Sequence, residues 1–343
     1  MQEAKFILSR KKVIEQYNKV KSIADIVSYS SKTNLDVTKI LEKETDSMFS
    51  VHFTNGLKHI KDKSRIIFLA QAWNQNDIKD LLDMGIRTFI IDNESDLNTF
   101  MNYLDKNPIK INLFLRLKLK EHTIRTEKFF VFGMNSDTIN KLIPKLRNNK
   151  CIDKLGIHFH RKTQNMAEWN LLYEISNTID KDVLEIIDYV NIGGGLPANY
   201  ANTNVDVIKN IFKKIQEFKE WLNQKNIQMI IEPGRFIAAP ALKLISYIIG
   251  IHENNIIVNA SVYNTDMDAL IVPVKLLVER EFPKGKGRPH VIKGITPCSL
   301  DIFRYRVYLK NPKIGDKIVF LNAGAYNFSS DFCDLVKLRT IVK

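Results

Sequence analysis

Apolar and polar positions follow two alternating patterns over the first two thirds of the chain. Short runs rich in β-branched residues are separated by longer segments whose apolar residues recur at helical spacing, as in the strand and helix units of a parallel sheet. We expect eight such strands, which begin at Ile26, Met48, Arg65, Thr88, Ile111, Leu155, Tyr189 and Met229. Eight strands with helices between them predict a (β/α)8 TIM barrel.

The segments between these strands support the same prediction. Four of them carry Asp, Asn or Ser near their starts, which are the residues preferred as helix caps. We expect helices within residues 74–85, 94–106, 136–149 and 166–179.

After Pro240 the pattern changes, because β-rich runs follow one another without regular helices between them. The sequence therefore predicts two domains: a barrel at residues 1–240 and a C-terminal all-β domain at residues 241–343. The first residues are expected to enter the barrel almost at once, without adding a strand to the β domain.

Composition indicates a folded protein of the cytoplasm. The chain has 343 residues, of which 45% are hydrophobic, and no apolar run approaches the roughly 20 residues of a membrane span. The N-terminus does not resemble a signal peptide. Cys151, Cys298 and Cys333 form no C-x-x-C pair, so we expect neither a metal site nor a disulfide framework.

The chain is basic, with 51 Lys and Arg against 38 Asp and Glu, a formal net charge of +13. The lysines are spread along predicted surface helices, and no basic block is interleaved with aromatic residues as in a single-strand binder. We therefore expect anionic small molecules as partners, and no nucleic acid.

Polar side chains collect at the carboxyl ends of the predicted strands, where barrel enzymes place their catalytic groups. These positions hold Lys32, His52, Gln71, Asp92, Arg116, His158, His160, the glycine triplet Gly193 to Gly195, and the cluster Glu232-Pro233-Gly234-Arg235. Together they suit a phosphorylated cofactor with an ionisable ring. Taken alone, the glycine triplet could also be a tight structural turn.

Five stretches, in order, resemble motifs of the fold-type III pyridoxal-phosphate decarboxylases, the group of ornithine and diaminopimelate decarboxylases. They are YSSKTN (29–34), LGIHFH (155–160), NIGGG (191–195) with IEPGR (231–235), TPCSLDIF (296–303) and NAGAYNFSSDF (322–332). The resemblance implies a barrel of the alanine racemase and ornithine decarboxylase type, bound pyridoxal 5′-phosphate, and α-decarboxylation of an amino acid. Alanine-racemase-like activity is disfavoured, because EPGR and the PCSLD cysteine resemble the decarboxylase branch.

The resemblance also implies a role for each matching residue. Lys32 would hold the cofactor through its amine, and Glu232 would keep the pyridine nitrogen protonated. Glu232 could instead form an ordinary ion pair with Arg235. The other implied cofactor contacts are His160 on the ring face, Arg116 beside the ring, and the phosphate ligands Gly193, Gly194, Gly195, Gly234, Arg235 and Tyr326. The chain departs from the family pattern after His160, where Thr163 in RKTQN (161–165) could stand in as a phosphate ligand.

Two residues of the β domain are implied to act across a homodimer. Cys298 would donate the proton that replaces carbon dioxide, and Asp301 would bind substrate, each in the active site of a partner subunit. The resemblance therefore implies a dimer with shared active sites.

The substrate stays open between alternatives. Residues 158–170 resemble divergent members that decarboxylate citryl-diamino acid intermediates of siderophores, and Arg161 and Lys162 suit such an anionic substrate. Asp266 and Asp268 could instead accept the distal ammonium of ornithine or lysine, for polyamine biosynthesis, or they could cap a turn. Diaminopimelate, for lysine biosynthesis, is less favoured, because Val272 stands where those enzymes tend to place an arginine. A third alternative is a non-catalytic homologue that binds a protein partner.

Overall fold

The computed structural model describes residues 2–119, 131–203 and 205–343. The chain divides into two compact units. The barrel unit comprises Asn18–Leu196 and Val207–Pro233, and the β unit comprises Met1–Tyr17, Pro197–Asp206 and Gly234–Lys343.

This division differs from the predicted boundary after residue 240. The segment Pro197–Asp206 belongs with the β unit because Ala201 N donates to Lys275 O (2.7 Å) and the Asn202 side chain donates to Pro273 O (2.9 Å). These bonds join segments more than seventy positions apart, so the apolar pattern carries no sign of them.

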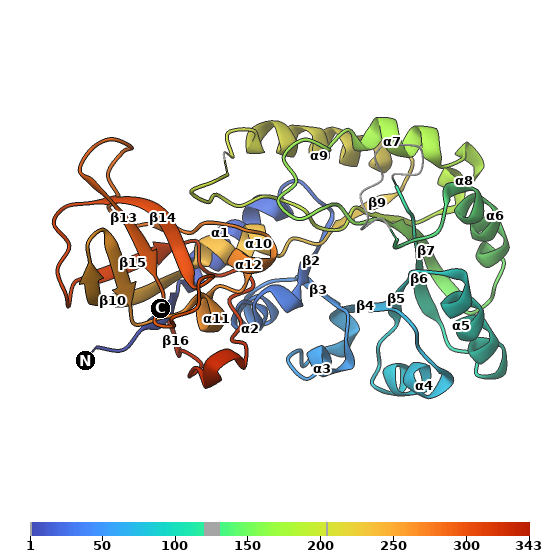
Figure 1. Cartoon of the computed structure of the whole chain (residues 1–343). Coiled ribbons are helices and arrows are strands. Elements are labelled where there is room, and N and C mark those ends of the chain that lie inside the picture. Colours follow the sequence, from blue (N-terminus) through green and yellow to red (C-terminus); the bar gives the residue numbers. More distant parts are fainter. Residues whose placement is uncertain (1, 120–130, 204) are drawn as a thin grey trace. The chain divides into compact units, whose positions relative to one another are not determined.

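The barrel unit contains the predicted barrel, closed by eight parallel strands in the described part of the chain (Figure 1). Ile67, Ile90, Phe114 and Ile230 form a buried cluster in its core. The strands are β2 (Ile26–Ser30), β3 (Met48–Val51), β4 (Ile66–Ala70), β5 (Thr88–Ile91), β6 (Ile111–Arg116), β7 (Ile152–His158), β8 (Tyr189–Asn191) and β9 (Gln228–Ile231). Each of the eight predicted strands is confirmed. They could be recognised in the sequence because parallel strands buried on both faces are rich in apolar residues.

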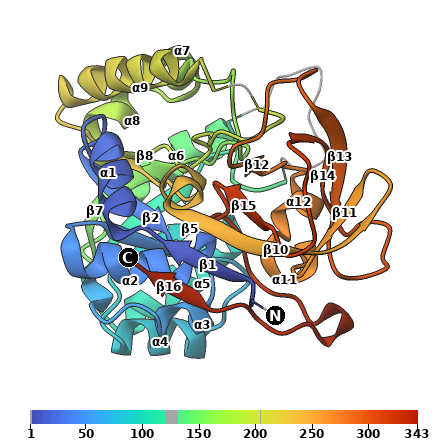
Figure 2. The ribbon, with the colours of Figure 1, turned by 90° about the vertical axis from the view of Figure 1, so that its left-hand side faces the viewer.

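Helices follow the strands around the barrel, and α7 and α9 lie side by side (Figures 1 and 2). The helices are α2 (Leu35–Glu44), α3 (Thr54–Leu57), α4 (Gln75–Asp83), α5 (Glu94–Lys106), α6 (Ser136–Arg147), α7 (Leu171–Thr178), α8 (Lys181–Ile186) and α9 (Ile208–Asn223), while α1 (Arg10–Lys21) spans the boundary between the units. Asn74, at the start of a predicted helical segment, caps α4, whereas α5 is capped by Asn93, which precedes the predicted segment 94–106. Among the described residues, no helix has both the length and the apolar character needed to cross a membrane.

The helix predicted within residues 166–179 begins later than expected, at Leu171. The residues before it form a loop instead. In this loop the Trp169 indole donates to Asn165 O (3.0 Å), and Asn165 N donates to Gly195 O (3.0 Å). The loop after β7 is thereby tied to the glycine triplet.

The β unit is built on an eight-stranded sheet in its described part. The path β12-β15-β10-β11-β13-β14 is extended by β1, which pairs with β10 and β16. The strands are β1 (Lys5–Leu8), β10 (Leu242–His252), β11 (Asn255–Val258), β12 (Leu277–Val278), β13 (Arg288–Lys293), β14 (Ile302–Leu309), β15 (Lys317–Leu321) and β16 (Thr340–Val342). The predicted C-terminal β domain is confirmed.

The sequence prediction was wrong about the N-terminus, because the chain does add a strand to the β unit before the barrel. β1 pairs antiparallel with β10 and parallel with β16, so segments near the two chain ends lie side by side (Figure 2). Its four residues are too few to show strand periodicity by themselves.

Short helices also interrupt the β-rich runs of this unit: α10 (Arg235–Ala238), α11 (Val262–Thr265) and α12 (Asp268–Ile271). The Ser261 side chain accepts a hydrogen bond from Tyr263 N (3.1 Å), and the Asn264 side chain accepts one from Ser261 N (3.0 Å). This capping box starts α11 in a domain where the sequence predicted no regular helices.

Candidate active site

Lys32 lies at the carboxyl end of the first barrel strand. β2 ends at Ser30, the turn Ser31–Thr33 follows, and Asn34 then caps α2 through its side chain. Ser31 and Thr33 are buried, whereas the Lys32 side chain is exposed. The turn therefore fixes the backbone on both sides of Lys32 and leaves its amine accessible.

Lys32 lines a cavity of about 550 Å³ within the barrel unit. Other lining residues come from the ends of several strands, where the sequence predicted a site. The lining comprises Lys32, His52, Phe53, Thr54, Phe68, Leu69, Gln71, Ala72, Trp73, Asp77, Leu81, Arg116, Phe132 and His160. Three phenylalanine rings and the indole of Trp73 give the cavity an apolar wall beside its cationic and imidazole groups.

Glu232 follows β9 and is buried, with 2% of its surface exposed. The Asn191 side chain donates to its Oε1 (2.9 Å), and His158 Nε2 lies 3.6 Å from its Oε2. Burial by itself raises the pKa of the Glu232 carboxyl, but the interactions with His158 and Asn191 outweigh it and lower this pKa below its usual range. Glu232 is therefore a carboxylate at neutral pH.

The titratable groups around Glu232 are shifted toward their neutral forms. Burial lowers the pKa of Lys32, an effect that Glu232 opposes and Arg116 reinforces. Burial also lowers the pKa of His52 to about 4 and that of His160 to about 3. Water reaches Lys32 and His160 although protein surrounds them, as expected for side chains on a cavity wall.

Arg116 ends β6 and is held from two sides. Its guanidinium donates to Asp92 Oδ1 at 2.8 Å and lies over the Phe132 ring, 5.0 Å from the ring centroid. Because Asp92 balances its charge, Arg116 adds a fixed hydrogen-bond donor to the cavity more than a net positive charge.

The glycine triplet is needed for close packing. A Cβ atom on Gly193 would lie 2.4 Å from the carbonyl oxygen of Phe159, and one on Gly194 would lie 2.8 Å from that of Glu232. Gly193 and Gly195 also have positive φ angles, +64° and +104°. The alternative of a tight structural turn therefore describes part of what this triplet does.

Two of the three amides in the triplet already have partners. Gly193 N donates to Asn191 Oδ1 (2.9 Å), and Gly194 N donates to His160 Nδ1 (3.3 Å). Gly195 N makes no hydrogen bond within the described residues. Of the three amides predicted to donate hydrogen bonds to a phosphate, only that of Gly195 has no partner among the described residues.

The loop after β7 places its two predicted substrate-binding cations differently. Arg161 is buried and pairs with Glu174 at 2.8 Å, so its charge is balanced inside the protein. Lys162 is exposed, and Thr163 is partly exposed. The prediction that Arg161 binds an anionic substrate conflicts with this geometry.

In the β unit, Arg235 belongs to a buried ion pair. Its guanidinium bonds to both carboxylate oxygens of Asp268 and to the Tyr200 hydroxyl (3.0 Å), and it lies 5.1 Å from the Tyr326 ring centroid. Arg235 and Asp268 are 3% and 2% exposed. Asp268 thus has a cation of its own chain as its partner, which conflicts with its predicted role of accepting a substrate ammonium.

Asp266 is buried beside this pair, with Oδ2 making no hydrogen bond in the described structure. Burial, followed by the nearby charge of Asp268, raises the pKa of Asp266 well above its usual range. Only 4% of the Asp266 surface is exposed, so its carboxyl group is hardly accessible to a substrate. This burial conflicts with its predicted contact with a substrate ammonium.

Cys298 and Asp301 lie close together in the β unit. The Tyr263 hydroxyl is 2.9 Å from Cys298 Sγ, and this hydrogen bond lowers the pKa of the thiol and raises the pKa of Tyr263 to about 12. Asp301 is fully buried and accepts bonds from Val262 N (2.9 Å) and from Thr296 N (3.0 Å) and Oγ1 (2.7 Å). Asp301 holds these loops together, which conflicts with its predicted contact with substrate.

Three residues with a part in these clusters received no role from the sequence. Asn191 orients Glu232 and the glycine triplet, His52 lines the cavity with Lys32, and Tyr263 contacts Cys298. Asn191 and His52 stand at strand ends, so their positions were a usable signal. Tyr263 gave none, because its contact joins residues 35 positions apart.

We expected no metal site, yet three side chains have a spacing that an ion could bridge. The ligand atoms of His158, His160 and Glu232 lie within 4.8 Å of one another. Since His160 and Glu232 are also predicted cofactor contacts, a metal ion and a cofactor ring would compete for the same groups.

A closed barrel with an amine, a buried carboxylate, imidazoles and a glycine loop at its strand ends defines a class of cofactor-dependent enzymes. Residues 11–239 match the family described as "pyridoxal-dependent decarboxylase, pyridoxal binding domain". Because this match covers more than half of the chain, the protein belongs to that family, the fold-type III amino-acid decarboxylases, whose cofactor is pyridoxal 5′-phosphate.

Individual relatives are distant. The chain is 22% identical over 333 residues to a diaminopimelate decarboxylase of Methanothermobacter thermautotrophicus, covering 88% of this chain and 76% of that protein. It is 21% identical over 296 residues to antizyme inhibitor 2 of Xenopus laevis, covering 78% and 62%. A lysine/ornithine decarboxylase structure from Vibrio vulnificus, complexed with putrescine, has the same fold, with a TM-score of 0.81, 22% identity and coverage of 99% and 94%.

The residues of the barrel unit fit pyridoxal phosphate. Lys32 is an accessible amine of lowered pKa, and Glu232 is a buried carboxylate that would suit a protonated ring nitrogen. The glycine triplet leaves no room for Cβ atoms at Gly193 and Gly194, and it presents the amide of Gly195.

Proposed function

We propose that this protein uses Lys32 and Glu232 to remove the α-carboxylate of an amino acid. The observation that carries the proposal is Lys32 itself: an accessible amine of lowered pKa on the wall of a cavity, within the electrostatic influence of the buried Glu232 carboxylate. A lowered pKa increases the fraction of neutral, nucleophilic amine at neutral pH.

When bound, pyridoxal phosphate supplies an electron sink for the bond to the departing carboxylate. Glu232 keeps its charge in a buried setting, so it would hold a proton on the ring nitrogen. His160, neutral at physiological pH, would lie against the ring without adding a competing charge. Arg116, fixed by Asp92, would donate a hydrogen bond from the cavity wall.

For the phosphate group we propose Gly195 N as a donor, with Thr163 from the adjacent loop. Gly234, Arg235 and Tyr326 of the β unit remain proposed ligands on the strength of the motif resemblance. Arg235 brings a guanidinium whose charge Asp268 already balances, so its contribution would be directional hydrogen bonding.

Cys298 is the proposed proton donor to the carbon that loses carbon dioxide. The hydrogen bond between Tyr263 and Cys298 positions the sulfur and lowers the thiol pKa, which makes proton transfer from sulfur easier. A homodimer in which Cys298 serves the partner's site remains part of the proposal.

As the substrate we propose a citryl-diamino acid conjugate, as in siderophore biosynthesis. Two features support it. Lys162 is an exposed cation in the loop tied to the glycine triplet. Asp266 and Asp268, the carboxylates predicted for a distal ammonium, are both buried, and Asp268 is paired with Arg235. The burial of Arg161 with Glu174 removes one cation on which this proposal first depended.

The second candidate is a free basic amino acid. The similarity of the chain to a diaminopimelate decarboxylase and to a lysine/ornithine decarboxylase favours it. Carbon dioxide release measured in parallel from citryl-ornithine, citryl-diaminopropionate, ornithine, lysine and diaminopimelate separates the two. The conjugates should give the highest kcat/KM, and faster turnover of any free diamino acid would reject the siderophore proposal.

A non-catalytic binding protein remains the third alternative, and the similarity to antizyme inhibitor 2 is the observation in its favour. Colour separates it from an enzyme. Purified protein with cofactor held on Lys32 is yellow and releases carbon dioxide from at least one amino acid, whereas a binding protein that has lost its cofactor is colourless and inert.

A further inference from the structure

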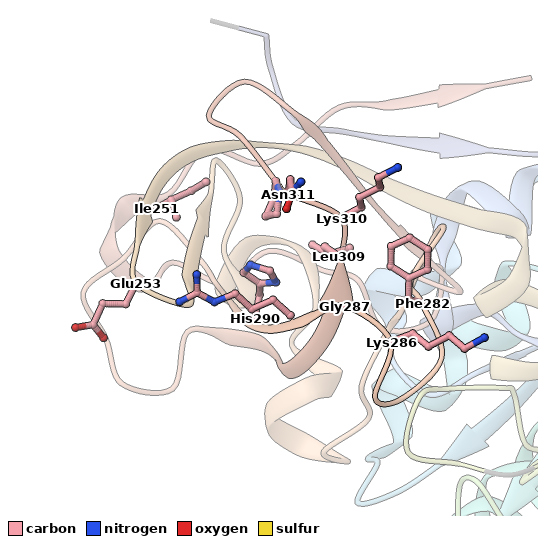
Figure 3. A pocket seen from close by; sticks show the side chains of 11 residues that line it. Ile251, Glu253, Phe282, Lys286, Gly287, His290, Leu309, Lys310 and Asn311 are labelled. Carbon is pink, nitrogen blue, oxygen red and sulfur yellow. The ribbon is translucent and has the colours of Figure 1, made fainter.

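A second cavity, of about 450 Å³, lies wholly within the β unit (Figure 3). Three connections form it: the turn between β10 and β11, the segment between β12 and β13, and the segment between β14 and β15. Its lining comprises Ile251, Glu253, Phe282, Lys286, Gly287, Arg288, His290, Leu309, Lys310, Asn311 and Pro312. No residue of the proposed catalytic machinery is among them.

The lining is rich in cations without partners. Lys286, Arg288 and Lys310 stand against a single carboxylate, Glu253, and none of the three cations forms an ion pair within the described residues. Figure 3 shows Lys286 and Lys310 on the two sides of Phe282, with Glu253 at the opposite end of the cavity. One end of the cavity is therefore electropositive.

The same end also exposes apolar surface. Phe282 is 38% exposed, and Leu309 and Pro312 line the cavity near the start of the β14 to β15 connection. A concave site that combines an accessible aromatic ring with a few charged groups is typical of small-molecule binding sites. The ring favours a ligand with an apolar body, and the ammonium groups favour a ligand with an anionic group.

The backbone holds this arrangement before any ligand binds. Phe282 N donates to Tyr308 O (2.9 Å), which fastens the backbone of Phe282 to β14, and Lys286 N donates to Pro283 O (3.0 Å). Gly287 has a φ of +87°, which lets the chain turn from this loop into β13. A loop held in this way loses little conformational entropy on binding.

We propose that this cavity binds a small organic anion, in which a phosphate or carboxylate group is attached to an apolar or aromatic body. Lys286 and Lys310, which flank Phe282, attract the anionic group, and the body of the ligand packs on the Phe282 ring. The site is independent of the barrel cavity and of the proposed decarboxylation.

The test uses the yellow holoenzyme, whose cofactor site is filled, and isothermal titration with phenyl phosphate. The wild-type protein should show saturable binding at one site per chain. Lys286→Ala combined with Lys310→Ala should weaken binding at least about tenfold, which equals roughly 1.4 kcal/mol. The matched control, Lys284→Ala combined with Lys313→Ala, removes the same charge from the same two connections at exposed positions outside the cavity lining, and it should stay within about twofold of wild type.

Further ligands separate the contributions. Benzoate should bind at the same site if a carboxylate suffices, and failure to bind would assign the site to phosphates. Inorganic phosphate should bind more weakly than phenyl phosphate, and Phe282→Ser should abolish this difference. Three results would overturn the proposal: no saturable binding to wild type, an equal loss in the lining and control variants, or equal affinity for phenyl phosphate and inorganic phosphate.

Discussion

Glu232 and Arg235 are three positions apart in one motif, equally buried, and opposite in their surroundings. Arg235 meets the carboxylate of Asp268 with both of its terminal nitrogens, so that two charges cancel. Glu232 meets a side-chain amide and an imidazole, neither of which supplies a permanent charge, and the neutral form is favoured for the histidines around it. Burial alone therefore does not identify a functional charged residue. A buried charge that lacks a permanently charged partner is the better indication of a functional site.

Replacing Lys32 in the barrel unit should have the largest effect on function. Lys32→Ala removes the amine that would hold the cofactor, so carbon dioxide release should fall at least about 10⁴-fold, or roughly 5 kcal/mol of transition-state stabilisation. Absorbance spectra and a carbon dioxide assay measure the two losses. Lys39→Ala, on the exposed face of α2, is the control and should keep both colour and activity.

Breaking the ion pair between Arg235 and Asp268 in the β unit should instead reduce stability. Asp268→Ala leaves the Arg235 guanidinium buried without its carboxylate, so the free energy of unfolding should fall by about 3–5 kcal/mol. Replacing both residues together, by Arg235→Met and Asp268→Leu, should cost less, because no unbalanced charge remains. Urea unfolding measures both variants, and a fully stable Asp268→Ala would show that the pair is not closed in solution.

Neutralising Glu232 should slow catalysis while leaving the fold intact. Glu232→Gln preserves shape but removes the charge that would keep the ring nitrogen protonated, and kcat should fall about 100-fold, or roughly 2.7 kcal/mol. The yellow colour should remain. Glu217→Gln, at an exposed position on α9, is the matched control, and equal rates for the two variants would remove Glu232 from the mechanism.

The smallest effect concerns pH. His52 and His160 have pKa values of about 4 and 3 in the folded protein, against an ordinary 6.5. As pH falls below 6.5 the unfolded chain binds protons that the folded protein does not, so stability is lost from about pH 6.5 toward pH 4. His52→Asn with His160→Asn should reduce the loss measured by urea unfolding between pH 7 and pH 5, at saturating cofactor. An unchanged loss would place both imidazoles in water.

The strands and the polar residues at their ends could be predicted from the sequence because they depend on the local pattern of apolar and polar residues. A barrel brings the carboxyl ends of all its strands to one face, so locating strands also located Lys32, Arg116, His160 and Glu232. The short helix α11 was missed because its four residues are too few to show helical periodicity.

The ion-pair partners of the charged residues could not be predicted from the sequence. Arg161 with Glu174, and Arg235 with Asp268, are joined by tertiary packing across 13 and 33 positions, and no local spacing encodes such pairs. These pairings changed the interpretation most, because each turns a predicted ligand-binding charge into a balanced internal one.

The direct test of the central claim is to fix the cofactor to the protein and find where it is attached. The yellow holoenzyme would be reduced with borohydride, digested and mapped by mass spectrometry. A pyridoxyl-phosphate group on Lys32, at close to one per chain and on no other lysine, is the expected result. Attachment to a different lysine, or no attachment at all, would contradict the assignment of Lys32 and the catalytic site built around it.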